Sequence, residues 1–313
     1  MFFIGWQNTI FESMIKRTLV FTTSGKLRLH LRQLVWEGED GRSSQVPIED
    51  IGFVILESPL ITVSTALLRE LAISNVAVVI CDASHMPGSY LLPVAGHTMC
   101  QKVMGMQMGL SAVKKDILWA QTVRRKIYNQ GCVAKRYNLS LGRDLIKWSK
   151  EVKRGDPNNL EAQAARAYFT IFTIDEIQPF HRVSTGPMPN PALNYGYAIL
   201  RAAVARALVS AGLNCMIGIH HHNQYDPYCL ADDIMEPYRP FVDMLILENY
   251  SIFEKSDELT PEMKRVLLGL LVMDVEIGKM KRPLMNALSL TAASIVRVIS
   301  GKDEEIEYPK VEV

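Results

Sequence analysis

The chain is 313 residues long and 48% hydrophobic, which is enough apolar material for a packed core and favours two domains. Its formal net charge is +1, so the whole-chain charge does not indicate a polyanionic partner. The five cysteines form no CxxC pair, which disfavours a disulfide framework or zinc knuckle and favours reduced thiols in a cytosolic protein. We identify no signal peptide and no long apolar run, so we expect a cytoplasmic protein without a membrane span.

The first ninety residues follow a two-residue hydrophobic period. Residues 26–31 alternate strictly between polar and apolar side chains, which predicts a half-buried strand. Residues 18–22 precede them across a turn at Ser24 and Gly25, which predicts a hairpin. Further strands are expected at 46–48, 52–56 and 76–81, and a single helix at 61–72. This part of the chain therefore reads as a small, mostly β structural or dimerising module.

A loop rich in proline and glycine at 86–97 marks a boundary near residue 95. We therefore expect an α+β protein with an N-terminal β-rich dimerisation domain (1–95) and a larger all-α catalytic domain (96–313). Beyond the boundary the hydrophobic period becomes helical. It predicts helices at 100–130 (loosened near Gly105 and Gly109), 158–169, 194–211, 261–278 and 283–300. The acidic tail at 303–307 is expected to be frayed and solvated.

Residues 101–154 are strongly basic. They contain 13 Lys and Arg against three acidic residues, a local net charge of +10. A solvated helical face explains such a run, and so does a cationic surface for a phosphate backbone. Both interpretations stay open at this point.

The stretch 218–243 contains the side chains that are best suited to catalysis or metal binding. His220, His221 and His222 lie in a polar loop. An acidic segment with Asp232, Asp233 and Glu236 follows the loop. Residues 233 and 236 share a face if the segment is helical, and neighbouring carboxylates repel unless a cation pairs with them. Adjacent histidines point in different directions, so one ligand from the three is expected. Such a mixed set suits Mg²⁺ or Mn²⁺ better than structural zinc.

Glu161 lies in the first turn of the helix expected at 158–169. A lone glutamate there is normally explained by favourable placement in the helix dipole. Hard divalent ions catalyse phosphoryl transfer, so a site of this kind beside a basic stretch fits a nucleic-acid phosphodiester as substrate.

Four groups of residues resemble the CRISPR-associated spacer-acquisition integrases, the first-numbered Cas protein family, and in particular members from type II systems. The resemblance covers most of the chain, and Ala162 stands where the family commonly has glycine. The matching residues are 48–51, 81–82 and 85–88; then Trp119, 126–127, 129 and 130; then 160–169; and finally 190, 193–197, 218–221 and 233–240.

Carried over by position, the resemblance implies that Glu161, His221 and Glu236 form a catalytic site that holds Mg²⁺ or Mn²⁺. Asp233 would support that site or bind a second ion. Arg239 would pair with a carboxylate or a phosphate. The expected contacts to DNA are Arg239 and, in the basic stretch, Arg124, Arg125 and Lys126.

The resemblance also implies an activity and partners. The enzyme would insert short double-stranded DNA fragments into a CRISPR array, by attack of a 3′-hydroxyl on a phosphodiester, and would cut DNA where water replaces the hydroxyl. It would work in the cytoplasm of a prokaryote as a homodimer with a small second Cas protein. Two alternatives are a mononuclear metal hydrolase or oxygenase acting on a small molecule, and a non-catalytic dimeric DNA-binding scaffold.

Overall fold

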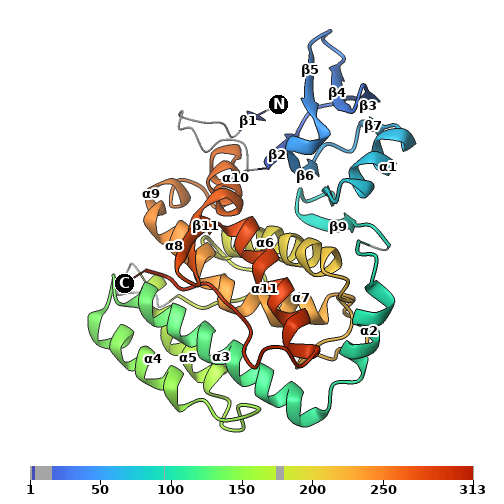
Figure 1. Cartoon of the computed structure of the whole chain (residues 1–313). Helices are drawn as coiled ribbons and strands as arrows, with labels where there is room; N and C mark the ends of the chain where they lie inside the picture. The colour runs from blue at the N-terminus through green and yellow to red at the C-terminus, as the bar shows by residue number, and fades with distance from the viewer. Residues whose placement is uncertain (1, 4–15, 95, 174–179, 313) are drawn as a thin grey trace. The chain divides into compact units, whose positions relative to one another are not determined.

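The computed structural model describes residues 2–3, 16–94, 96–173 and 180–312. The chain divides into two compact units, Met1–Thr98 and Met99–Val313 (Figure 1). The first unit is rich in strands and the second is mainly helical, so the fold is a mixed α and β architecture.

In its described residues the N-terminal unit contains two sheets and one α-helix, α1 (Thr65–Ile73). The five-stranded sheet has the order β1-β2-β6-β8-β9, with β2, β6 and β8 parallel, and the four-stranded sheet has the order β5-β4-β3-β7. The bounds in the first sheet are β1 Phe2–Phe3, β2 Arg17–Phe21, β6 Ile51–Leu56, β8 Ala77–Cys81 and β9 Pro87–Leu91. Those in the second are β3 Gly25–His30, β4 Gln33–Gly38, β5 Ser43–Pro47 and β7 Ile61–Val63, and a 3₁₀ turn, η2 (Ile48–Asp50), precedes β6.

The strands at 17–21 and 25–30 do not form the expected hairpin. β2 pairs in parallel with β6, whereas β3 pairs with β4 and β7 in the other sheet. Their inward side chains still meet, because Leu19 of β2, Leu27 of β3 and Leu67 of α1 belong to one buried hydrophobic cluster. The turn at 22–24 therefore carries the chain from one sheet to the other across a shared core.

Two further expectations for this unit are corrected. The helix expected at 61–72 begins only at Thr65, because residues 61–63 pair with β3, and Ser64 caps the helix by accepting from the N–H of Leu67. The segment expected as a loop at 86–97 contains β9, which pairs antiparallel with β8. The hydrophobic pattern of the sequence does not reveal either short strand, because strand pairing is a tertiary interaction.

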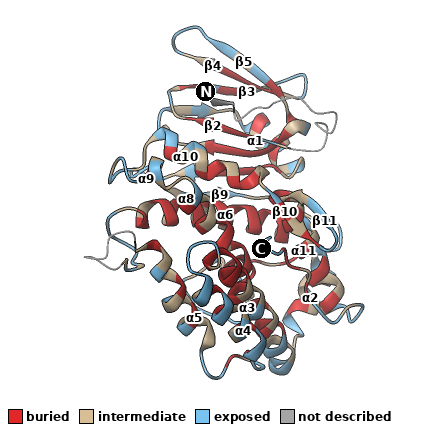
Figure 2. Cartoon of the chain, turned by 90° about the vertical axis from the view of Figure 1, so that its left-hand side faces the viewer, coloured by how far each residue is buried: buried red, intermediate tan, exposed pale blue. Residues whose placement is uncertain are grey.

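Ten α-helices of the C-terminal unit lie in the described residues. The buried centre is α6, whose residues from 192 to 208 are largely inaccessible to solvent (Figure 2). Helices α7, α8, α10 and α11 pack against α6, and α3 packs against α4 and α5. The bounds are α2 Cys100–Met108, α3 Ala112–Ala134, α4 Leu139–Glu151, α5 Leu160–Tyr168, α6 Asn190–Ser210, α7 Cys229–Met235, α8 Arg239–Glu248, α9 Tyr250–Phe253, α10 Pro261–Leu268 and α11 Leu284–Ile299. Short 3₁₀ turns follow α5 (η3, Phe169–Phe172), α7 (η4, Glu236–Tyr238) and α10 (η5, Gly269–Val272).

The helix break expected near Gly109 is confirmed. α2 ends with Gly109 as its C-cap, and Ser111 caps α3 by accepting from the N–H of Lys114. Gly105, by contrast, lies inside α2. The end of α6 follows the prediction too, since Gly212 adopts a positive φ of 83°, as a glycine just after a helix does.

The C-terminal unit is not all-α. Where a helix was expected at 261–278, α10 stops at Leu268 and the antiparallel strands β10 (Asp274–Ile277) and β11 (Met280–Pro283) follow. The tail beyond 303 is not frayed either, because Ile306, Tyr308 and Val311 are buried. The N–H of Lys310 also donates to the carbonyl of Glu276. The acidic residues that suggested a solvated end alternate with these apolar anchors.

No helix in the described residues combines the length and the apolar character that a membrane crossing requires.

Candidate metal-binding site

Glu161 is fixed by the loop that starts α5. The Asp156 carboxylate accepts from the N–H groups of Leu160 (3.0 Å) and Glu161 (2.9 Å), and Asn159 caps the helix through the N–H of Ala162. Polar side chains thus satisfy the first N–H groups of the helix, as helix starts require. The result is a carboxylate in the first turn of α5 that stays partly open to solvent.

Glu236 comes from the turn η4, between α7 and α8, and is buried. The side-chain amide of Asn129 on α3 donates to the carbonyl of Pro237 at 2.8 Å, which ties η4 to α3. One helical turn earlier, Lys126 also points inward. These contacts place the glutamate against the middle of α3.

Lys126 brings the two glutamates together. Its ammonium donates to Oε1 of Glu161 and lies within ion-pair distance of Oε2 of Glu236, although the second contact is outside hydrogen-bond geometry. Carboxylates 75 positions apart in the chain therefore converge on one cation. Burial alone would lower the pKa of Lys126, but the charges of Glu236 and Glu161 outweigh it and raise that pKa.

Arg239 holds the other oxygen of Glu236. Its Nε donates to Oε1 at 2.9 Å, and its guanidinium lies 4.5 Å from the ring centre of Tyr197. Burial alone would raise the pKa of Glu236, but Arg239 and Lys126 oppose it and hold that pKa at about 2. Glu236 is therefore ionised throughout the neutral range, as a metal ligand must be. The carboxylate pairing anticipated for Arg239 is present.

Asp233 organises the histidine loop. Its fully buried carboxylate accepts from the N–H groups of Ile219 (2.6 Å), His220 (3.0 Å) and His221 (3.1 Å), and Oδ1 lies 2.7 Å from Nδ1 of His221. Gly218 allows this tight turn, because a Cβ there would lie 2.1 Å from the carbonyl oxygen of His221. The hydrogen bond to Asp233 raises the pKa of His221.

The three adjacent imidazoles enter three different environments. His220 stacks on Trp119 with ring centres 4.1 Å apart and an angle of 3° between the planes. His222 is exposed, and its Nδ1 lies 2.7 Å from the carbonyl of His220. His221 meets the edge of Trp119 and pairs with Asp233, and its charge acts on Glu236. His221 is thus the imidazole that pairs directly with an acidic side chain.

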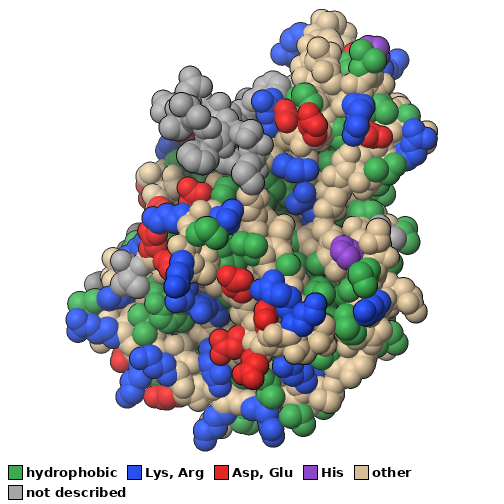
Figure 3. Space-filling view, viewed as in Figure 1, with side chains coloured by type: hydrophobic (Ala, Val, Ile, Leu, Met, Phe, Trp, Pro, Cys, Tyr) green, Lys and Arg blue, Asp and Glu red, His purple; other side chains and the backbone are tan. Residues whose placement is uncertain are grey.

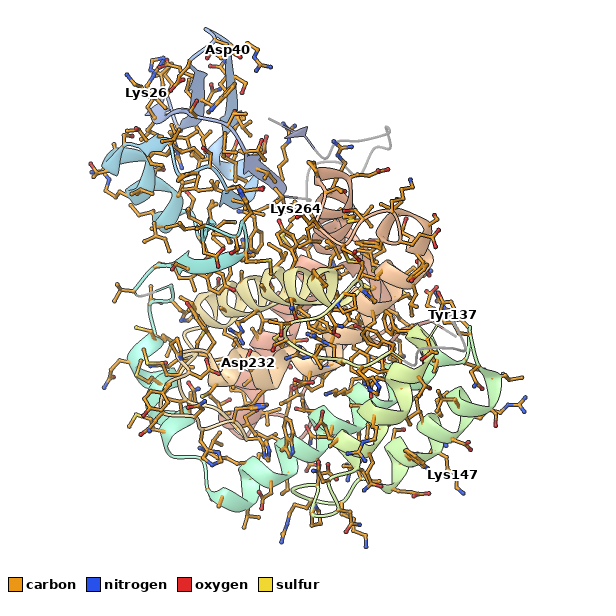
Figure 4. All side chains as sticks on the ribbon, turned by 180° about the vertical axis from the view of Figure 1, so that it is seen from behind. Lys26, Asp40, Tyr137, Lys147, Asp232 and Lys264 are labelled. Atoms are coloured by element: carbon orange, nitrogen blue, oxygen red, sulfur yellow. The ribbon has the colours of Figure 1, made fainter. Side chains whose placement is uncertain are left out.

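The neighbouring acid, Asp232, has a different partner. It lies on α7 (Figure 4) and accepts from Nε and Nη2 of Arg201 on α6 at 2.7 and 3.1 Å. Burial raises the pKa of Asp232 to about 6, more than Arg201 lowers it. Asp232 therefore belongs to the packing of α7 on α6.

The residues of the site fit a divalent cation. Among the described residues, no three His, Cys, Asp or Glu side chains already surround one point at metal distances, and between Glu161 and Glu236 that position holds the Lys126 ammonium. Two carboxylates and one imidazole form a donor set that suits Mg²⁺ or Mn²⁺. The Oε2 atom of Glu236 is buried and its close partner is the Lys126 ammonium, so an ion bound to this oxygen would take the place of that positive charge.

The four residues expected to contact DNA lie in different surroundings. Arg124 donates twice to the carbonyl of Val152 (3.1 and 2.9 Å), and Arg125 lies 5.5 Å from the ring centre of Tyr128. Lys126 is not on the basic surface where it was expected, because it is buried between two glutamates. Arg239 likewise points into the acidic cluster.

Sequence reasoning missed Lys126 as a member of the acidic site. One signal was available, since residues 119, 122, 123, 126, 127 and 130 repeat at helical spacing and form the buried face of α3. A lysine at a core position of that face needs buried acidic partners.

Comparison with known proteins identifies the family. The model of the family "CRISPR associated protein Cas1" matches residues 19–268. The chain belongs to the Cas1 family. It is 33% identical over 300 residues to the CRISPR-associated endonuclease Cas1 of Neisseria meningitidis serogroup C, an alignment that covers 95% of this chain and 97% of that relative.

Solved structures share the fold. A casposase bound to its integration product superposes with a TM-score of 0.79 at 19% identity, over 95% of each chain. A Cas1 protein from Thermotoga maritima superposes with a TM-score of 0.72 at 16% identity, over 95% of this chain and all of that one. The mixed architecture described above is therefore that of solved Cas1 structures.

Proposed function

We propose that this Cas1 protein is a metal-dependent DNA endonuclease and integrase that inserts short DNA fragments into a CRISPR array by 3′-hydroxyl transesterification. The observation that carries the proposal is the meeting of Glu161 and Glu236 at one cation, beside an imidazole oriented by Asp233. The names of related proteins support it: the Neisseria relative is an endonuclease, and the casposase was solved with an integration product.

Glu161, Glu236 and the Nε2 atom of His221 would hold the Mg²⁺ or Mn²⁺ ion. A bound ion of this kind polarises a phosphodiester and lowers the pKa of an attacking hydroxyl. The protein's own groups prepare the site. Asp233 fixes the tautomer and the orientation of His221, and Arg239 fixes the rotamer of Glu236. Lys126 and Arg239 balance the negative charges of Glu161 and Glu236.

The basic stretch would hold the DNA backbone. In Figure 3 Lys and Arg side chains are spread over the lower part of the molecule, where α3 and α4 lie, with acidic side chains among them. Arg124 and Arg125 belong to this surface, whereas Lys126 acts within the site. Contacts to phosphates position a duplex without reading its sequence, which suits the capture of arbitrary fragments.

The partners follow from the same proposal. A homodimer, formed through the N-terminal domain, would present two sites for coordinated reactions on opposite strands. A small second Cas protein would join the complex, and solved structures of a Cas6-RT-Cas1–Cas2 complex share the fold of this chain. The substrates would be a double-stranded prespacer and the CRISPR repeat, in the cytoplasm of a prokaryote.

A strand-transfer assay tests the proposal. The purified protein, with its small Cas partner, is incubated with labelled prespacer and a plasmid carrying the repeat, with Mn²⁺ or with a chelator. We expect joined product with Mn²⁺ alone, loss of product in Glu161→Ala and His221→Ala with duplex binding retained, and product in Gln163→Ala, an exposed change two positions along α5.

Other outcomes point elsewhere. Duplex binding that is insensitive to Mn²⁺ and yields no product would indicate a DNA-binding scaffold. Absence of DNA binding would indicate an enzyme for small molecules. Full strand transfer by Glu161→Ala would remove that residue from the site.

A further inference from the structure

A second site lies on another face of α3. An open pocket of about 370 Å³ is bounded by α3, by the end of α4 and by the C-terminal segment 305–310. Its charged lining residues are Arg124, Arg125, Lys150, Glu305 and Lys310. On α3 the lining positions 121, 124, 125 and 128 form one helical face, whereas Lys126 turns toward the glutamates.

The neutral polar groups of this wall already have partners. Gln121 donates to the carbonyl of Glu304 and accepts from the N–H of Ile306, which anchors the C-terminal segment on α3. The hydroxyl of Tyr308 lies 2.8 Å from that of Thr122. The wall is therefore built by internal hydrogen bonds that need no ligand.

The charged groups of the wall are not balanced. Four cations, Arg124, Arg125, Lys150 and Lys310, face a single carboxylate, that of Glu305. Within the described residues, none of these four forms an ion pair within 4.0 Å. Arg125 is the most enclosed of them, and burial lowers its pKa. Glu305 and the nearby Glu276 only partly offset these four cations, so the lining keeps an excess of positive charge that an anion would balance.

The size and charge of the pocket define the anion. A volume of this order lies at the lower end of the range for small-molecule sites, which corresponds to about one nucleotide. A phosphodiester carries one negative charge, whereas a phosphomonoester carries about 1.5 to 2 at neutral pH and presents three acceptor oxygens. Guanidinium groups bind such a terminal phosphate with charge-assisted hydrogen bonds. Nε and Nη2 of Arg124 already donate to the carbonyl of Val152, which leaves Nη1 and the second proton of Nη2 for a ligand.

We propose that the pocket between α3, α4 and the C-terminal segment binds the terminal phosphate of a nucleotide, through Arg124, Arg125, Lys150 and Lys310. The phosphate can belong to a free mononucleotide or to the end of a DNA strand. Binding of a strand end rests on the proposed function, since an enzyme that joins DNA has to hold the ends of its substrate strands. The phosphate chemistry itself does not involve the metal site.

Binding measured in chelator tests the inference separately from catalysis. Anisotropy is recorded at fixed ionic strength with the full chain and a 3′-labelled single strand of about ten nucleotides, carrying a 5′-phosphate or a 5′-hydroxyl. Unlabelled dAMP, deoxyadenosine and inorganic phosphate serve as competitors. The test variant is Lys150→Ala with Lys310→Ala. The matched control is Lys147→Ala with Lys302→Ala, which removes the same charge from the same helix and tail outside the pocket (Lys147 is labelled in Figure 4).

We expect the phosphorylated strand to bind about tenfold more tightly than the hydroxyl strand, through charge-assisted hydrogen bonds. That preference should vanish in the pocket variant and persist in the control. Competition by dAMP but not by deoxyadenosine would identify the free nucleotide as a ligand, and competition by phosphorylated strands alone would identify the strand end. Equal binding of both strands by the native chain, or equal loss of preference in both variants, would overturn the inference. A failed strand-transfer assay would leave these results unaffected.

Discussion

Nδ1 of His221 lies 2.7 Å from Oδ1 of Asp233, a carboxylate with no solvent exposure. An ionised carboxylate accepts hydrogen bonds, so Nδ1 carries the proton and Nε2 keeps its lone pair for another partner. Because Asp233 also accepts three backbone N–H groups of the loop, the ring and the loop are oriented by one side chain. This is the arrangement by which carboxylates orient metal-binding histidines.

Asp233→Asn should weaken Mn²⁺ binding about 10- to 100-fold, the usual effect of losing such an orienting carboxylate. The amide cannot serve the three N–H donors and the imidazole equally, so His221 loses its fixed tautomer. Calorimetric titration of the metal measures the effect. Asp232→Asn is the matched control, because its carboxylate pairs with Arg201, and it should bind Mn²⁺ nearly as the native chain does. Equal affinity in the Asp233 variant would contradict the role of Asp233.

Lys126→Met should destabilise the metal-free protein by about 3 kcal/mol, because removing one member of a buried ionic cluster leaves charges uncompensated. The measurement is urea unfolding in chelator, with Lys114→Met, at the start of the same helix, as control. Saturating Mn²⁺ should stabilise the Lys126 variant more than the native chain, since an ion restores the missing positive charge. A variant with native stability in chelator would show that the ammonium is not the counter-charge of Glu161 and Glu236.

The acidic cluster shows what the sequence can predict. Motif resemblance selected Glu161, His221 and Glu236 as the site, and tertiary packing brings the first and the last of them to one ammonium. Lys126 was assigned to a DNA surface because net charge counts residues without regard to the helical face they occupy. Its neighbours on the buried face of α3 carried the missing information.

The strands show the same limit, which is that a sequence pattern does not reveal tertiary partners. Alternation at 26–31 predicted a strand correctly, but the partner of each strand depends on contacts distant in the sequence. β2 and β3 therefore joined different sheets. The hairpin at 274–283 and the buried tail were missed for a related reason, since the N–H of Lys310 bonds to the carbonyl of Glu276 and neither segment signals the other.

Asp243 gives the stability a pH dependence of unusual sign. Burial raises its pKa to about 6, and the hydrogen bond from Tyr197 (2.5 Å) only partly opposes this. The folded chain holds this proton more tightly than the unfolded chain, whose aspartates titrate near pH 4. Stability from this group is therefore complete below about pH 4 and is lost as pH rises through about 6, in total about 3 kcal/mol.

Asp243→Asn should remove that dependence. The difference in unfolding free energy between native chain and variant should change by about 2 kcal/mol from pH 4 to pH 7, in favour of the variant at the higher pH. Urea unfolding across this range measures it. Asp144→Asn, on the exposed side of α4, removes the same charge and serves as control. A constant difference across the range would refute the assignment.

Gly142 allows α3 and α4 to pack closely. A Cβ at this position would lie 2.5 Å from both the backbone nitrogen and the Cα of Lys135, so one helix would have to move. Gly142→Ala should therefore destabilise the protein by about 1–3 kcal/mol through overpacking. Gly105→Ala is the matched comparison, because nothing lies within 4 Å of its Cβ and alanine favours the helix by about 1 kcal/mol. Thermal unfolding should separate the two in opposite directions, and a shift of the same sign in both would contradict the packing argument.

DNA binding should weaken steeply with salt if the basic surface of residues 101–154 neutralises phosphates. The logarithm of the binding constant then falls linearly with the logarithm of salt concentration, with a slope that counts the phosphates contacted. Arg143→Ala, on the exposed side of α4, should lower the magnitude of the slope by about one. Arg28→Ala, in the N-terminal sheet where Arg28 pairs with Glu37, should leave it unchanged. A nearly flat response of the native chain between low and physiological salt would mean that DNA is held by contacts other than phosphate neutralisation.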